Sequence, residues 1–176
     1  KIILNENQQP ERWIKNFVFI TGGQNSSEQI TFANQSNSII NSYISPNPIS
    51  GLPVKIYRND STGGVTYNYQ DSIIRSINNG STIVNYIGHA ATNVWDNGLE
   101  DPTVLSNNLR QPIVFSMTCF TGKNAETNER SFGEKFYYNP NKGAIGFVGS
   151  TGWSFSGSGN TYNLYLFQGF ANDSIR

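Results

Sequence analysis

The sequence contains little charge, one histidine and one cysteine. Charged residues make up 14% of the 176 residues, and 12 basic side chains balance 12 acidic ones. Without a basic excess, the composition indicates neither nucleic acid nor an anionic membrane surface as a partner. A single cysteine excludes an internal disulfide, and no apolar run is long enough to predict a membrane span.

The remaining composition is typical of one folded domain. Hydrophobic residues make up 36% and aromatic residues 13%, which is too much for a disordered chain of such low charge. The length suits a single domain spanning residues 1–176. The first residue is lysine and the last segment has a helical pattern, so we expect this domain to be a fragment of a longer chain.

Short apolar runs alternate with segments of helical periodicity along the chain. Runs rich in β-forming residues predict strands at 13–23, 54–58, 82–89, 111–119 and 143–151. Helices are predicted at 25–44, 68–80, 130–138 and from 161 onward, with a helical turn after Asp101. This order predicts an α/β fold, with a mostly parallel central sheet flanked by helices on both faces.

The only histidine and the only cysteine each follow a predicted strand. His89 ends the strand at 82–89, and Cys119 ends the next strand along the chain. Functional groups gather at the carboxyl ends of parallel strands, and neighbouring strands lie about 4.8 Å apart. The pattern therefore favours a thiol activated by an imidazole, although a buried cysteine and a turn histidine are the structural alternatives. One His and one Cys lack the further ligands of a zinc site.

Several segments around this pair resemble the gingipain family of cysteine peptidases. The matching segments, in order, are NYIGHA followed by VW, FSMTCFTG, SFGEKF and KGAIGFVGSTGWSF. Residues 82–155 carry nearly all of the resemblance. It implies the caspase-like fold, a three-layer sandwich, and a polypeptide substrate.

The resemblance also implies roles for individual residues. Cys119 would be the nucleophile and His89 the general acid and base. The backbone N–H groups of Cys119 and Ala90 would form the oxyanion hole. The family usually has glycine after the histidine, and alanine tolerates a positive φ less readily than glycine does.

Residues on the loops around the pair are candidates for substrate binding. Trp153 matches an aromatic residue of the family's substrate pocket, and Trp95 lies in the loop after His89. Either tryptophan could instead cover the sheet as a hydrophobic lid. Ser150 and Thr151 match the family's substrate strand, so the resemblance implies that their backbone pairs with an extended peptide.

A basic substrate side chain would require a carboxylate in the pocket. Glu28 is the candidate, and Asp96 and Glu126 are further loop acids. Glu28 is also the only acid near TGGQN, where the family's acid that orients the histidine would fall. Each of the three acids has the alternative of a solvated surface charge.

Together these observations predict a cysteine endopeptidase that works through a thioester. The resemblance leaves its role open among a sortase or other processing peptidase of secreted proteins, a digestive peptidase and a transpeptidase. The resemblance implies a secreted or cell-surface protein of the Bacteroidetes, with secretion-system components or further domains of its own chain as partners. No cofactor is expected, and structural calcium is left open without an assignable site. The alternatives are a catalytically inactive peptidase-like binding or secretion module, and an α/β domain that binds a nucleotide at Gly22–Gly23.

Overall fold

A five-stranded parallel sheet forms the centre of the molecule. The computed structural model describes residues 11–60 and 69–173. The strands lie in the order β2-β1-β3-β6-β7, and every neighbouring pair is parallel. Their bounds are β1 Asn16–Thr21, β2 Leu52–Tyr57, β3 Ile83–Ile87, β6 Ile113–Met117 and β7 Gly146–Gly149. The predicted adjacency of the strands before His89 and Cys119 is confirmed, because β3 pairs directly with β6.

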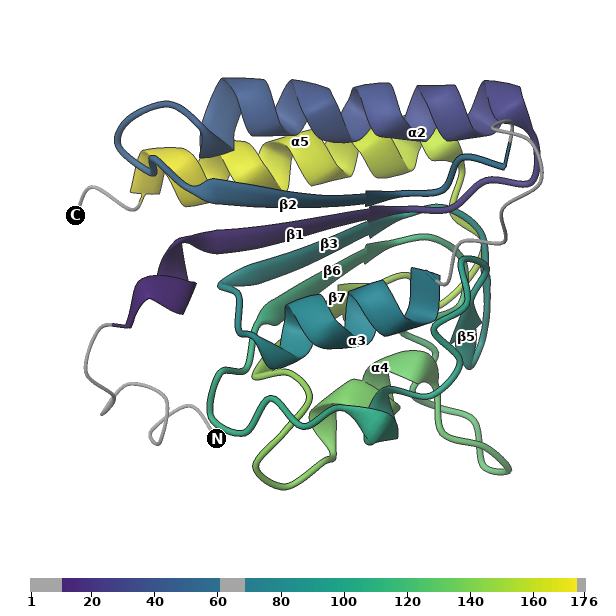
Figure 1. Ribbon diagram of the computed structural model, residues 1–176. Coiled ribbons are helices and arrows are strands. Elements are labelled where there is room, and N and C mark those ends of the chain that lie inside the picture. The colour runs from purple at the N-terminus through teal and green to yellow at the C-terminus, as the bar shows by residue number, and fades with distance from the viewer. Residues whose placement is uncertain (1–10, 61–68, 174–176) are drawn as a thin grey trace.

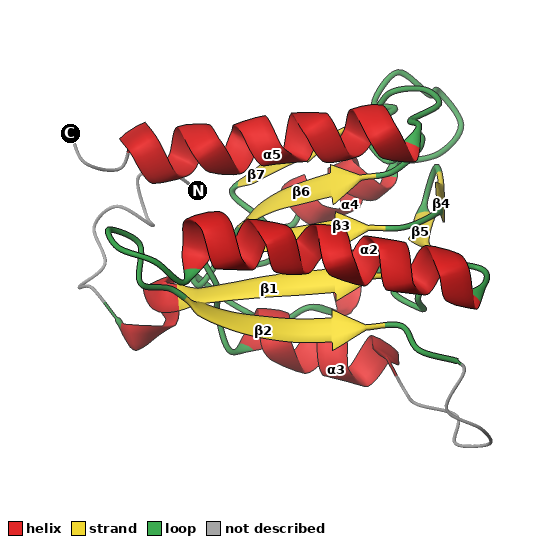
Figure 2. Cartoon of the chain, turned by 90° about the horizontal axis from the view of Figure 1, so that it is seen from above, coloured by secondary structure: helices red, strands yellow, loops and turns green. Residues whose placement is uncertain are grey.

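Helices cover both faces of this sheet, which confirms the predicted three-layer α/β architecture. The helices α2 (Ser26–Ile39) and α5 (Ser156–Asp173) lie side by side on one face (Figures 1 and 2). The helices α3 (Tyr69–Asn78) and α4 (Phe132–Tyr137) lie on the other face. Short helical segments also occur: η1 at Arg12–Lys15, η2 at Ile40–Ile44 and η3 at Pro102–Val104.

The alternation of side chains along each strand divides the core into two layers. Phe19, Ile83 and Phe115 lie in the apolar layer beneath α2 and α5. Val84 and Val114, one residue away in sequence, lie in the layer beneath α3 and α4. Because both faces are covered, the strands are apolar at consecutive positions, and this explains the continuous apolar runs in the sequence.

Two elements near the carboxyl edge of the sheet differ from the prediction. The segment expected to be mostly loop contains a small hairpin, β4 (Ala90–Ala91) paired with β5 (Val94–Trp95). Helix α5 begins at Ser156, although its first turn contains glycine and serine, which are weak helix formers. Packing of α5 against β6 and α2 overrides that local preference.

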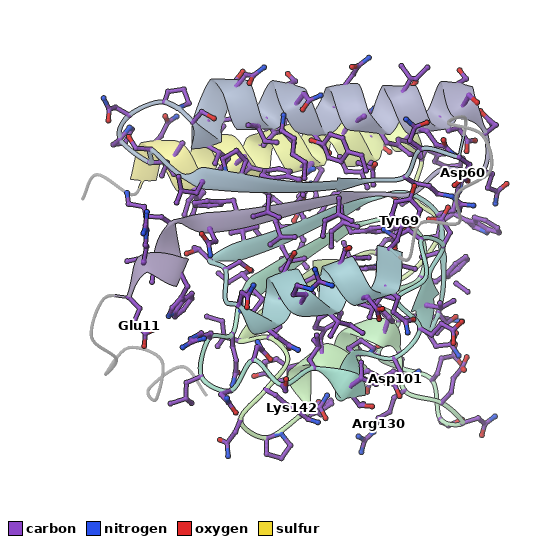
Figure 3. The ribbon with its side chains drawn as sticks, viewed as in Figure 1. Glu11, Asp60, Tyr69, Asp101, Arg130 and Lys142 are labelled. Atoms are coloured by element: carbon purple, nitrogen blue, oxygen red, sulfur yellow. The ribbon has the colours of Figure 1, made fainter. Side chains whose placement is uncertain are left out.

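The carboxyl edge is the end of the sheet at which the candidate residues lie. Asp60 follows β2 at this edge, whereas Glu11 lies at the opposite end of the molecule (Figure 3).

No helix within the described ranges is long and apolar enough to cross a membrane.

Candidate active site

The register of β3 against β6 brings His89 and Cys119 to one place. Ile87 pairs with Met117, and His89 and Cys119 each follow two residues later. Both side chains line a single small cavity of about 50 Å³ at the carboxyl edge. The two residues thus share a cavity, although they are 30 positions apart in the printed sequence.

This cavity opens on the side of the sheet that α2 and α5 cover. Its floor includes Ile87 and Met117, and Phe32 of α2 and Asn160 of α5 contribute further walls. The ring of Phe32 packs edge-on against the imidazole of His89, with ring centroids 6.1 Å apart. The imidazole is therefore held on one side by an apolar residue.

A carboxylate from α2 holds the imidazole on another side. Asn25 caps α2 through its Oδ1, which accepts from the N–H of Glu28 at 3.0 Å, and this cap places Glu28 in the first turn. Glu28 Oε2 lies 3.1 Å from His89 Nε2 and accepts from the N–H of Gln24 at 2.8 Å. The pKa of the Glu28 carboxyl lies below its usual value, mainly because the carboxylate accepts from the Gln24 N–H. Partial burial raises this pKa, and the hydrogen bond and charge attraction of His89 lower it further.

The expectation that Glu28 selects a basic substrate side chain is not supported by this geometry. Glu28 lines neither the cavity of Cys119 nor the larger cavity beside it. Its carboxylate instead contacts the imidazole, which is the arrangement that orients a catalytic histidine. The sequence pointed to Glu28 for this orienting role only because it is the one acid near TGGQN.

The backbone at His89 is fixed by Tyr86 and Asp96. The carbonyl oxygen of His89 accepts from the Asp96 N–H at 3.0 Å and from the Tyr86 hydroxyl at 2.5 Å. The same hydroxyl contacts the Asp96 carboxylate, whose Oδ2 accepts from the Gly23 N–H at 3.2 Å. Burial raises the pKa of Tyr86 well above its usual value and Asp96 raises it further, so the hydroxyl stays protonated. Asp96 therefore holds the loop of His89 rather than a substrate side chain.

Trp95 connects the loop of His89 to the loop of Cys119. Its ring stacks on Tyr86, with centroids 4.3 Å apart, and its Nε1–H donates to Ser116 Oγ at 2.9 Å. Ser116 Oγ also accepts from Thr121 Oγ1 at 3.0 Å, and the Thr121 N–H donates to the carbonyl of Cys119 at 2.7 Å. The prediction that Trp95 binds substrate is wrong, because the β4–β5 hairpin turns the fully buried ring into the core beneath α3 and α4.

The loop of residues 150–155 closes against Cys119. The sulfur of Cys119 accepts from the Ser154 N–H at 3.3 Å and lies 3.4 Å from the Ser154 carbonyl oxygen. The next residue, Phe120, has a φ of 58°, and its N–H donates to the carbonyl of Gly152 at 3.0 Å. A left-handed phenylalanine costs about 1–3 kcal/mol, so these contacts hold the backbone after the thiol in a strained conformation.

A larger cavity of about 460 Å³ lies next to the small one and shares Met117, Ser154 and Gly159 with it. Ser150, Thr151 and Trp153 line this larger cavity. The side chain of Trp153 is 77% exposed and packs edge-on against Phe120, with centroids 4.9 Å apart. Three of the predicted substrate-binding residues therefore lie together beside Cys119.

Ala90 takes no left-handed backbone conformation. It lies in β4, opposite Trp95 in the hairpin, and the positive φ values of non-glycine residues in the described ranges fall at Ser50, Asn108, Phe120 and Asn141. The concern that alanine would strain the residue after His89 is therefore removed. The strained residue is instead Phe120, directly after Cys119, where the chain has phenylalanine rather than glycine.

The glycine turn after β1 is already filled by acidic side chains. The N–H of Gly23 donates to Asp96, and the N–H of Gln24 donates to Glu28. Two carboxylates at these donors would repel a phosphate group. The turn therefore offers no support for the alternative of a nucleotide site at Gly22–Gly23.

The last loop acid that the sequence offered, Glu126, forms an ion pair with Lys123. It lines neither of the two cavities beside Cys119. Within the described ranges, no group of three or more His, Cys, Asp or Glu side chains is placed to hold a metal ion. Structural calcium, which the sequence left open, therefore stays without an assignable site.

The fold and this site define a class of protein, namely α/β domains in which a cysteine and a histidine meet at the carboxyl edge of a parallel sheet. The model of Peptidase family C25 matches residues 1–176, so the chain belongs to this family, which is the gingipain family of cysteine peptidases. No curated protein sequence matches the chain significantly.

Solved structures share the fold at low sequence identity. The Arg-specific cysteine proteinase gingipain R (RgpB) superposes with a TM-score of 0.70 and 19% identity, over 92% of this chain and 38% of that one. The complex of Porphyromonas gingivalis RgpB pro- and mature domains gives a TM-score of 0.66 and 18% identity, over 89% of this chain and 37% of that one. A structure described as a protease gives a TM-score of 0.75 and 18% identity, over 91% of this chain and 34% of that one. The chain thus spans little more than a third of these proteins.

Proposed function

We propose that this chain carries the catalytic centre of a cysteine endopeptidase, with Cys119 as nucleophile and His89 as general acid and base. Glu28 orients the imidazole and stabilises its charged form. The observation that carries the proposal is the shared cavity of Cys119 and His89, together with the 3.1 Å contact between His89 Nε2 and Glu28 Oε2. A nucleophile, a base and a group that orients the base are the arrangement that covalent catalysis requires.

The proposed reaction has two steps. The Cys119 thiolate attacks the peptide carbonyl carbon, a carbon–sulfur bond forms, and the imidazolium of His89 gives its proton to the leaving amine as the carbon–nitrogen bond breaks. Water then attacks the thioester and gives a proton to His89, and the carbon–sulfur bond breaks to release the acid and restore the thiolate.

Backbone N–H groups would stabilise the oxyanion in both steps. The N–H of Cys119 donates to no backbone carbonyl within residues 11–60 and 69–173, so it is available to a substrate oxygen. The N–H of Ala90 is the second proposed donor. Removing one such donor in other enzymes lowers the rate by about two to three orders of magnitude.

The substrate would be a polypeptide that lies across Ser150, Thr151 and Trp153. The large cavity lined by these residues, beside Cys119, supports this placement. Membership of the peptidase family supports a role in cleaving proteins, and we extend the proposal to a sortase or processing peptidase of a secreted or surface-exposed protein. Secretion-system components and further domains of its own chain are the proposed partners.

Covalent labelling of the protein tests this function. A peptidyl acyloxymethyl ketone should label Cys119 of the wild-type protein at least about a hundredfold faster than it labels the His89→Ala variant. Iodoacetamide gives the intrinsic reactivity of the thiol in both proteins, and Cys119→Ala gives the background. The proposed mechanism would be refuted if labelling by the peptidyl ketone were independent of His89 and no faster than expected from the intrinsic reactivity of the thiol, as measured with iodoacetamide.

One observation favours the alternative of an inactive peptidase-like binding module. The backbone of Ser154 contacts the Cys119 sulfur through both its N–H and its carbonyl oxygen, and the cavity at the thiol is small. A module of this kind would bind a peptide without forming a covalent bond. In the labelling experiment, added peptide would protect Cys119 of such a module from iodoacetamide, but Cys119 would not react with the peptidyl ketone.

A further inference from the structure

The walls of the cavity that holds Cys119 and His89 are uncharged apart from these two residues. Phe32, Ile87 and Met117 supply apolar surface. Ser156 and Asn160, which come from the first turns of α5, supply neutral polar groups. Among the residues that the structure describes, no carboxylate lines this cavity or the larger cavity beside it.

The acids that could have selected a basic side chain are each engaged elsewhere. Glu28 contacts His89 and the Gln24 N–H, and Asp96 contacts Tyr86 and the Gly23 N–H. Glu126 pairs with Lys123. Moving Glu28 or Asp96 toward a substrate would break the contacts that fix His89, so neither is free to bind an arginine or lysine side chain.

The size of the cavity restricts the substrate further. Its volume of about 50 Å³ is shared between the thiol and the imidazole. Since a single water needs at least roughly 10–15 Å³ on this measure, the space takes only a few non-hydrogen atoms. A methyl or hydroxymethyl group fits this space, whereas a long side chain would have to displace Phe32 or the segment at Ser154.

Asn160 supplies a neutral polar side chain to the wall of this cavity. Its Oδ1 is buried and accepts no hydrogen bond from any described residue. The residue therefore contributes no charge that would select a basic substrate side chain.

From these observations, and given the peptidase function proposed above, we infer that the site cleaves after small, uncharged residues such as alanine or serine. The residue before the scissile bond places its side chain in the small cavity. The walls of this cavity thereby exclude the arginine or lysine that a carboxylate-lined pocket would select.

Four peptidyl acyloxymethyl ketones separate size from charge at this position. They carry alanine, leucine, 2,3-diaminopropionic acid or arginine next to the reactive group and are otherwise identical. With the full-length protein, the alanine probe should label Cys119 fastest, and the leucine and diaminopropionic acid probes should each be slower by about tenfold or more. The arginine probe should be the slowest.

A variant tests whether Asn160 faces the bound side chain. Asn160→Asp changes the charge at nearly constant shape, and it should raise the rate of the diaminopropionic acid probe relative to the alanine probe by about tenfold. Gln168→Glu makes the same change of charge at an exposed position of α5 and should leave this ratio unchanged.

The outcomes separate this inference from the peptidase function. Labelling that depends on His89 but is fastest with arginine or leucine would overturn the inference and leave the function intact. An unchanged ratio in Asn160→Asp would also overturn the inference. If no probe reacts faster than a free thiol, both the inference and the function fail.

Discussion

His89 Nε2 lies 3.1 Å from Glu28 Oε2, although the two residues are 61 positions apart in the chain. The contact joins the residues after β3 to the first turn of α2, a helix that packs over β1, the neighbour of β3 in the sheet. The exposed fraction of the side chain is 41% for His89 and 33% for Glu28, so the pair remains accessible to a substrate. The geometry makes Glu28 the residue whose replacement tests the orientation of the imidazole.

Glu28→Gln should lower the rate at which a peptidyl ketone labels Cys119 by about tenfold to a hundredfold, less than the loss expected for His89→Ala. Glutamine keeps an oxygen that can accept from the Gln24 N–H, but it removes the charge that stabilises an imidazolium. Glu100→Gln, at an exposed position of the same charge, is the matched control and should label as the wild type does. Equal labelling by the two variants would show that Glu28 has no part in catalysis.

The same variant has a defined effect on stability against pH. The pKa of Glu28 is lowered in the folded protein, so the carboxylate stabilises the fold above the unfolded pKa, near 4.5, and this contribution disappears as the pH falls through the lowered value. Because the site is partly exposed, we expect the free energy of unfolding of the wild type to exceed that of Glu28→Gln by no more than about 1 kcal/mol at pH 7. Urea unfolding of both proteins from pH 7 to pH 3 measures the difference. A difference that grows toward low pH would contradict the assignment.

The link between the two loops makes a prediction about Trp95. Trp95→Phe removes the N–H that donates to Ser116 Oγ and keeps an aromatic ring against Tyr86, and it should lower the free energy of unfolding by about 1–3 kcal/mol. Ser116→Ala removes the other partner. In a double-mutant cycle the two changes should be coupled by about 0.5–1.5 kcal/mol, whereas additive effects would show that the hydrogen bond contributes nothing.

The sequence was sufficient to predict the sheet and the common edge at which Cys119 and His89 lie. Continuous apolar runs fixed the strands, and the placement of both residues at the ends of successive strands fixed their common edge. Neither inference needed a long-range contact to be known in advance, since β3 and β6 are consecutive strands of the main sheet.

Other parts of the site depend on contacts that no local pattern encodes. The approach of Glu28 to His89 requires the Asn25 cap at the start of α2 and the packing of α2 over β1, the neighbour of β3. Trp95 was expected on the loop after His89, but a hairpin of two-residue strands turns it into the core. A hairpin this short has too few residues to show a periodicity of two.

The close approach of Gly88 to Tyr86 supports a further prediction. A Cβ at Gly88 would lie 2.4 Å from the Tyr86 hydroxyl oxygen and 3.0 Å from Gly22 Cα. Gly88→Ala should therefore displace the hydroxyl that holds the His89 carbonyl, destabilise the fold by about 1–3 kcal/mol and slow the labelling of Cys119.

Gly169→Ala is the matched control for Gly88→Ala, because the same methyl group would meet no atom within 4 Å outside its own helix. In α5 it should stabilise the protein by up to about 1 kcal/mol through helix propensity and leave labelling unchanged. Urea unfolding and the labelling rate of each variant measure the contrast. If Gly88→Ala were as stable and as reactive as the wild type, the Tyr86 hydroxyl would not be needed to position His89, and the support we assign to Asp96 would lose its basis.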